Sequence, residues 1–150
     1  MAGPVGLFPY LVVSDAKAAI DFYKKAFGAT EVMRHSAPKS DKLMHVHMIV
    51  FGSAFYFADD FPEHMGRSRT PQAIGGTPVT LHLQVDDAQS VWNSAMANGA
   101  TVVMPLADQF WGDRYGQLRD PFGHEWSIGQ TRQTLSDADV EKAAEVAFKA

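Results

Sequence analysis

The 150-residue sequence predicts an α+β protein built from two tandem βαβββ modules and a C-terminal helix. The first indication is an internal repeat, because the chain matches itself when it is shifted by 71 positions. The matched positions are Asp15 with Asp86, Gly28-Ala29-Thr30 with Gly99-Ala100-Thr101, and Phe51-Gly52 with Phe122-Gly123. The second indication is that each copy has the same order of strand and helix signals.

In the first copy, residues 10–13 form a short apolar run that is typical of a strand. Ser14 or Asp15 then caps a helix, and Gly28 ends it at a position where positive φ is favoured. The apolar face of this helix consists of Ala19, Ile20, Tyr23, Ala26 and Phe27. Three further strands are expected at residues 31–34, 43–51 and 54–58, with a turn at Gly52-Ser53.

The second copy follows the same plan. A strand is expected at residues 79–85, and Asp86 or Asp87 begins a helix that ends at Asn98-Gly99. Strands at 101–104, 115–119 and 125–128 follow, with a turn at residues 120–123 before the last one. Module one therefore covers about 5–58 and module two about 79–130 of one domain, and the 59–78 linker is a crossover or a lid.

The C-terminal segment, about residues 136–149, begins with Ser136-Asp137, which is a typical helix start. It continues with an apolar stripe at helical spacing, which predicts packing on the body or on a second subunit. The residues of the stripe are Val140, Ala143, Ala144, Ala147 and Phe148.

Composition excludes several functions. Lys and Arg number 13 and Asp and Glu 17, so the net charge of −4 argues against nucleic acid as a partner. There is no Cys, which excludes disulfides, thiolate metal sites and cysteine nucleophiles. Neither a signal peptide nor a membrane-spanning run is expected, and the longest apolar run, residues 48–58, is typical of a hairpin. These features predict a cytoplasmic protein without a membrane partner.

The duplicated module resembles the vicinal oxygen chelate superfamily, which includes glyoxalase I, extradiol dioxygenases and bleomycin-resistance proteins. The residues that carry the resemblance are Val13-Ser14-Asp15, Asp21-Phe22-Tyr23, Phe27-Gly28-Ala29, Val85-Asp86-Asp87, Gly99-Ala100, Trp111-Gly112-Asp113-Arg114 and Asp120-Pro121-Phe122-Gly123-His124. The stretch from Phe110 to Trp126 is most similar to the PhnB-like, glyoxalase-related branch. The resemblance implies that the modules form a curved mixed sheet around a cleft, and it favours a homodimer.

Metal-dependent members of that superfamily place one ligand on the first and one on the last strand of each copy. Carried over to this chain, these positions fall near Phe8 or Pro9, Tyr56, Thr80 and Ser127. None of them is His, Glu or Asp, the side chains that divalent metals require here. No cofactor is therefore favoured. A displaced site formed by His47, His82 and Glu125 is the alternative, and its donors suit Zn, Fe or Mn.

The favoured interpretation is a small-molecule-binding protein whose cleft holds an organic ligand. Strand alternation places Thr80, His82 and Gln84 on one face of their strand. In their own strands, Glu125 shares a face with Ser127, and His45 shares a face with His47. The predicted ligand-binding residues are His47, His82, Gln84, Trp111, Arg114 and Glu125. The alternative is a metal-dependent lyase, isomerase or dioxygenase that uses the displaced site.

Three features have open interpretations at this stage. Asp113 and Arg114 either orient a polar ligand or form a local salt bridge at a strand start. In the linker, His64 and the segment 67–69 either form a lid over an anionic ligand or are solvated loop charges. Trp126 is expected in the core, whereas Phe55 either lines an aromatic cleft or lies in the core.

Overall fold

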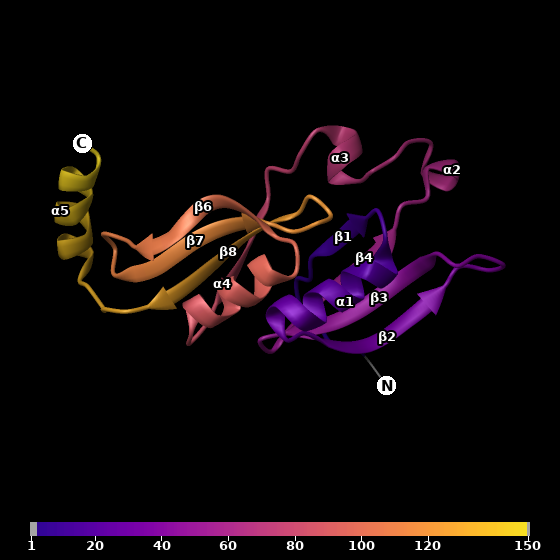
Figure 1. Ribbon diagram of the computed structural model, residues 1–150, viewed down its shortest axis with the longest axis horizontal. Coiled ribbons are helices and arrows are strands. Elements are labelled where there is room, and N and C mark those ends of the chain that lie inside the picture. The colour runs from indigo at the N-terminus through magenta and orange to yellow at the C-terminus, as the bar shows by residue number, and fades with distance from the viewer. Residues whose placement is uncertain (1–2, 150) are drawn as a thin grey trace. The chain divides into compact units, whose positions relative to one another are not determined.

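The computed structural model describes residues 3–149, which divide into a unit that ends at Thr77 and a unit that begins at Pro78 (Figure 1). The first unit contains β1 (Tyr10–Val13), α1 (Ala16–Phe27), β2 (Thr30–Ser36), β3 (Leu43–Val50) and β4 (Ser53–Asp59). Its sheet has the order β1-β4-β3-β2, in which β1 is parallel to β4 and the other pairs are antiparallel. The predicted βαβββ module is confirmed.

The second unit repeats this topology. It contains β5 (Thr80–Gln84), α4 (Ala88–Ala97), β6 (Thr101–Asp108), β7 (Asp113–Arg119) and β8 (Glu125–Thr131), followed by α5 (Asp137–Ala147). Its sheet has the order β5-β8-β7-β6, again with one parallel pair, β5 with β8. The α+β class, the two modules and the C-terminal helix are thus all confirmed. Within residues 3–149, no helix combines the length and the apolar character needed to cross a membrane.

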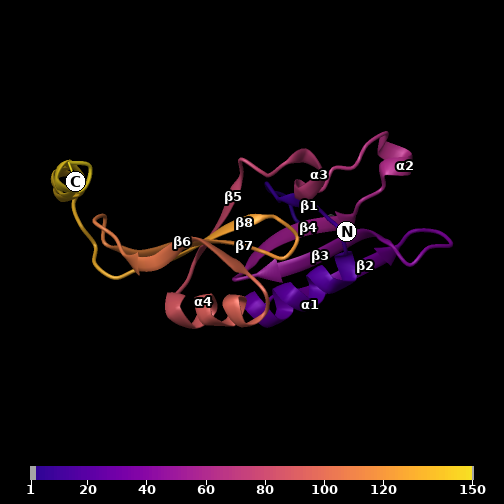
Figure 2. The same cartoon turned by 45° about the horizontal axis from the view of Figure 1, so that its top comes forward.

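In the first unit, one face of the sheet packs against α1 and forms the core. Val46, Met48 and Phe57 alternate along β3 and β4 and are fully buried beneath the helix. The Tyr23 ring of α1 contacts the Phe55 and Phe57 rings edge-on, at centroid distances of 5.2 and 5.5 Å. This alternation follows from the two-residue period of a strand, and it leaves the opposite face without a helix. Figure 2 shows α1 on one side of this sheet and the linker on the other.

The core of the second unit is built in the same way against α4. Leu118, Trp126 and Ile128 are buried under this helix, and the Trp126 indole N–H donates to the Asp120 carboxylate at 2.9 Å. Gly116 is required here, since a Cβ at this position would lie 2.8 Å from the Leu106 Cα. The predicted core position of Trp126 is confirmed, and Phe55, for which the sequence left core or cleft open, also lies in the core.

The N-cap residues of α1 and α4 show that the repeat offset of 71 does not hold at the helix starts. Asp15 accepts from the Ala18 N–H at 3.0 Å and Asp87 accepts from the Ser90 N–H at 3.1 Å, so Asp15 corresponds to Asp87 and not to Asp86. The helix start is therefore repeated at an offset of 72, whereas Gly28 and Gly99 keep the offset of 71. The reason is that the second copy has one residue fewer between its N-cap and this glycine.

A single carboxylate joins three elements of the first unit. Asp59, at the end of β4, is buried and accepts from the Ala16 N–H of α1 at 2.8 Å and from the Leu43 N–H of β3 at 2.7 Å. In the second unit the corresponding residue is Gln130, whose side-chain oxygen accepts from the Ala88 N–H of α4 at 2.9 Å. These contacts hold each helix start to the last strand of its module.

The linker contains two short helices that the sequence did not predict, α2 (Pro62–Met65) and α3 (Pro71–Ile74). Each begins with a proline and ends at a glycine in the left-handed region. The C-terminal helix α5 begins at the predicted Ser136 cap, whose hydroxyl accepts from the Asp139 N–H at 3.2 Å. None of the described α5 residues is buried. Of the predicted stripe, Phe148 reaches the body, with its ring centroid 6.0 Å from that of Phe110, and packing on a second subunit stays a prediction.

We predict that Asp59→Ala lowers the free energy of unfolding by about 3 kcal/mol, because it leaves two buried N–H groups without an acceptor. Urea unfolding followed by circular dichroism measures this change. The matched variant Gln130→Ala removes one neutral acceptor and is expected to cost about 1 kcal/mol. Equal losses in the two variants would contradict the role assigned to the carboxylate.

Candidate ligand-binding site

The first sheet carries histidine and tyrosine side chains on the face opposite α1, which we call the first open face. It is defined by Tyr10, Val12, His45, His47, Tyr56 and Ala58. The Tyr10 hydroxyl lies 2.8 Å from the His45 Nδ1, and the His45 and Tyr56 rings meet edge-on at 5.1 Å. The predicted common face of His45 and His47 is confirmed, since both flank Tyr56 on this surface.

Burial and like charge lower the pKa of His45. Desolvation is the largest cause, and the neighbouring His35 and His47 add repulsion against a protonated ring. Burial also raises the pKa of the Tyr10 hydroxyl. The Tyr10–His45 pair is therefore neutral at pH 7, and its hydroxyl–imidazole hydrogen bond is a neutral one.

His47 is the most enclosed polar side chain of this face. It is 8 % exposed, its ring meets the Tyr56 ring edge-on at 4.8 Å, and its Nε2 atom is buried without a hydrogen-bond partner among residues 3–149.

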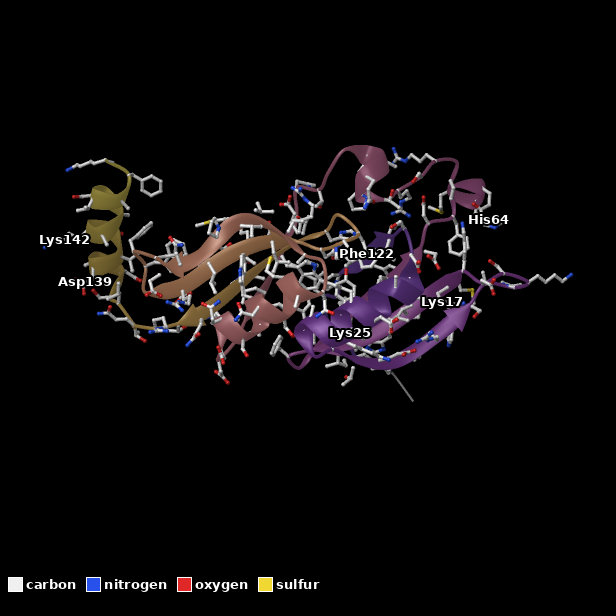
Figure 3. All side chains as sticks on the ribbon, in the orientation of Figure 1. Lys17, Lys25, His64, Phe122, Asp139 and Lys142 are labelled. Atoms are coloured by element: carbon white, nitrogen blue, oxygen red, sulfur yellow. The ribbon has the colours of Figure 1, made fainter. Side chains whose placement is uncertain are left out.

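A cavity of about 540 Å³ lies in the first unit, between the first open face and the linker. Tyr10, Val12 and Ala58 form its floor on the sheet, and α2 contributes His64 and Met65. Figure 3 shows the labelled His64 side chain on α2. The remaining lining residues are Ala37, Pro38, Met44, Asp59, Asp60, Phe61 and Arg69. The walls are mostly apolar, so the cavity suits an organic molecule rather than a hydrated ion.

Polar contacts fasten the linker over this cavity. Lys42 donates to the Asp60 carbonyl at 2.8 Å, and its ammonium lies 5.1 Å from the centroid of the Phe61 ring. The Asp60 carboxylate accepts from the Ser68 hydroxyl and from the Arg69 N–H. The linker is therefore tied to the β2–β3 loop through Lys42, and its own segments are joined through Asp60.

The second sheet has a different open face, on the side opposite α4. A continuous row of hydrogen bonds crosses it: the Ser127 Oγ lies 2.7 Å from the His82 Nδ1, the His82 Nε2 lies 2.8 Å from the Gln84 Oε1, and the Gln84 amide donates to the Thr131 hydroxyl at 3.0 Å. Since the Gln84 Oε1 can only accept, the His82 Nε2 carries the proton and Nδ1 accepts from Ser127. The predicted common faces of Thr80, His82 and Gln84 and of Glu125 and Ser127 are confirmed.

A glycine makes room for this row, and aromatic rings border it. A Cβ at Gly129 would lie 2.7 Å from the His82 Cε1 and 2.8 Å from the Gln84 Oε1. The Tyr115 ring stacks on His82 at 5.8 Å and meets the Trp111 ring at 5.5 Å. This face combines a polar row with a flat aromatic edge.

The structure groups some of the six predicted ligand-binding residues and separates others. His82, Gln84, Glu125 and Trp111 belong to the second open face or its border, and His47 lies on the first open face. Arg114 lies on the helix-covered face of the second sheet, where it donates to Asp108 at 3.0 Å and approaches the Gln89 side chain of α4. Of its two interpretations the local salt bridge is found, although the partner is Asp108 rather than Asp113.

The donors named for the displaced metal site do not fit a divalent cation. Both ring nitrogens of His82 are engaged, by Ser127 and Gln84, and the Glu125 carboxylate is paired with Arg119 at 2.8 Å. Across residues 3–149, no three or more His, Asp and Glu side chains are arranged to hold a metal. The carried-over superfamily positions, Tyr56 and Ser127 among them, lack imidazole or carboxylate groups.

None of the six predicted residues lines the 540 Å³ cavity, so sequence reasoning missed this feature. One signal was present, because Phe61 and Met65 are unusually apolar for a solvated linker. The cavity itself depends on how the linker folds back over β1 and β4, which no local pattern specifies.

Comparison with known proteins assigns a family description to the chain. Residues 5–128 match the family model described as the Glyoxalase/Bleomycin resistance protein/Dioxygenase superfamily. An uncharacterised protein of Mycobacterium bovis, Mb0911c, is 47% identical over 138 residues, which cover 91% of this chain and 90% of that protein.

Solved structures share the fold of this chain. The protein PA1353 from Pseudomonas aeruginosa is 25% identical and superimposes with a TM-score of 0.67, covering 87% of this chain and 100% of that chain. A PhnB protein from Bacillus cereus, 17% identical, has a TM-score of 0.64 with coverages of 84% and 99%. At this identity the second likeness concerns the fold alone.

Proposed function

Because the chain belongs to the glyoxalase/bleomycin resistance protein/dioxygenase superfamily, we propose that it is a small-molecule-binding protein. The ligand is an organic molecule that occupies the cavity between the first open face and α2. The observation that carries this proposal is the 540 Å³ volume with predominantly apolar walls. Ligand pockets of small molecules span about 300–1,000 Å³ and are lined in the same way.

The two carboxylates and the tyrosine hydroxyl of the cavity favour binding over chemistry. The Asp59 carboxylate is committed to two backbone N–H groups, and Asp60 to Ser68 and the Arg69 N–H. The Tyr10 hydroxyl is held by His45. A catalytic acid or base needs a proton position that is free to exchange with a substrate. The oxygen atoms of these three groups are instead engaged in hydrogen bonds within the first unit.

The sequence-predicted residues of the second unit form a second contact surface in this proposal. His82, Gln84, Glu125 and Trp111 would present a polar row with an aromatic edge to a ligand, whereas Arg114 is left out because it faces α4. A homodimer, a cytoplasmic location and the absence of nucleic-acid and membrane partners remain predictions from the sequence.

The alternative, a metal-dependent lyase, isomerase or dioxygenase using His47, His82 and Glu125, is not favoured. Binding a divalent metal there would break the hydrogen bonds of His82 and the ion pair of Glu125. The superfamily description itself covers both binding proteins and enzymes, so it does not choose between them.

We predict that the neutral probe N-phenyl-1-naphthylamine binds saturably and that Met65→Glu weakens its binding at least fivefold. Met65 lines the cavity and is half exposed, so a carboxylate in the wall repels an apolar guest without disturbing the core. Probe fluorescence gives the affinity. The control Ile74→Glu changes an equally exposed linker residue outside the cavity and should have no effect. Equal weakening by both variants would place the probe elsewhere.

We predict less than one-tenth of a divalent metal ion per chain when the protein is purified without chelator and without a metal-affinity resin, as measured by elemental analysis. Two of the three residues of the alternative site, His82 and Glu125, already have partners within the second sheet. Near-stoichiometric Zn, Fe or Mn that disappears in His82→Ala, and persists in the exposed control His64→Ala, would establish the metal-dependent alternative instead.

A further inference from the structure

The cavity has two polar side chains left over for a ligand, the Arg69 guanidinium, which is a cation, and the His64 ring. Its two carboxylates, Asp59 and Asp60, both accept hydrogen bonds from their own unit. By contrast, the Arg69 guanidinium makes no hydrogen bond or ion pair among residues 3–149, and the His64 side chain contacts only the Phe61 ring, at 6.1 Å. The uncommitted donors therefore come from Arg69 and His64.

These donors stand at the linker side of a wall that is mostly apolar. Tyr10, Val12, Met44 and Ala58 face them from the sheet and its edge, and Phe61 and Met65 lie on the linker itself. An arginine in this position presents a planar set of donors that matches carboxylate, sulfonate or phosphate oxygens. Its guanidinium forms no ion pair with an acid among residues 3–149, and the neighbouring Asp60 carboxylate is hydrogen-bonded to the Ser68 hydroxyl and the Arg69 N–H.

From this arrangement we propose that the cavity selects amphiphilic anions: organic molecules with an aromatic or aliphatic body and a single carboxylate, sulfonate or phosphate that pairs with Arg69. This proposal rests on the proposed small-molecule function and adds the class of ligand. It also assigns a role to the linker. The sequence left two interpretations for His64 and residues 67–69, a lid over an anionic ligand or solvated loop charges. In this proposal, Arg69 of that segment recognises the anion.

A matched pair of probes tests the proposal. 8-Anilinonaphthalene-1-sulfonate and N-phenyl-1-naphthylamine share the same naphthyl and anilino body, and only the first carries a negative charge. The wild-type protein is expected to bind the sulfonate about tenfold more tightly, with the preference decreasing at high ionic strength. Fluorescence titrations at two salt concentrations measure both affinities.

Arg69→Gln is expected to remove most of that preference, weakening the sulfonate about fivefold to tenfold and changing the neutral probe less than twofold. Arg67→Gln is the matched control, because Arg67 lies two residues away in the same linker, is exposed, and does not line the cavity. Both variants replace exposed arginines, so the fold is expected to survive in each.

The outcomes separate the two proposals. If both probes bind but the wild type shows no preference, or if Arg69→Gln and Arg67→Gln weaken the sulfonate equally, the assignment of anionic ligands is wrong while the small-molecule function stands. If neither probe binds saturably, the proposed function itself fails. Loss of sulfonate binding in Arg69→Gln alone supports the assignment.

Discussion

The buried Asp59 carboxylate is the contact on which the architecture of the first unit depends. It joins the start of α1 and the start of β3 to the end of β4, and so fixes the helix against one face of the sheet. A buried carboxylate is tolerated only when it is fully hydrogen-bonded, and here two backbone N–H groups meet that requirement. The opposite face is thereby left without a helix, and the linker closes over it to form the cavity.

The second unit joins its helix to its last strand in the same way, but through the neutral side-chain amide of Gln130 instead of a carboxylate. Gln130 bonds the start of α4 but, within residues 3–149, accepts no second hydrogen bond like the one from Leu43. The open face of this unit carries a row of hydrogen bonds between its own side chains. Duplication has therefore produced two sheets of one topology whose open faces differ in chemistry. The first has aromatic and histidine side chains beside an apolar volume, and the second has a saturated polar row.

Much of the fold could be predicted from the sequence, because its signals are local. The glycines at 28 and 99, the acidic N-caps and the alternation in β5 and β8 each specify geometry over a few residues. The offset of the helix starts was wrong by one residue, since Asp86 and Asp87 are adjacent and only the hydrogen bond to Ser90 distinguishes them. The alternation within β5 and β8 was enough to place His82, Gln84, Glu125 and Ser127.

The candidate site was harder to predict because it depends on contacts between distant segments. The side of the sheet on which Arg114 lies is decided by the register of β7 and by the Asp108 carboxylate of β6, a strand whose pairing shifts twice. The cavity arises only when Phe61, Met65 and Arg69 fold back over β1, and two four-residue helices leave almost no periodic signal. The chemistry of the linker residues was visible in the sequence, whereas their location was not.

The central claim is that a ligand sits between the first open face and α2. Chemical-shift mapping in ¹⁵N-labelled protein, titrated with 8-anilinonaphthalene-1-sulfonate, tests it most directly. The account predicts that the amides of Val12, Met44, Ala58, Met65 and Arg69 shift together along one saturation curve, while those of α1 stay in place. Shifts confined to α1 or to the second unit, with these five amides unmoved, would contradict it.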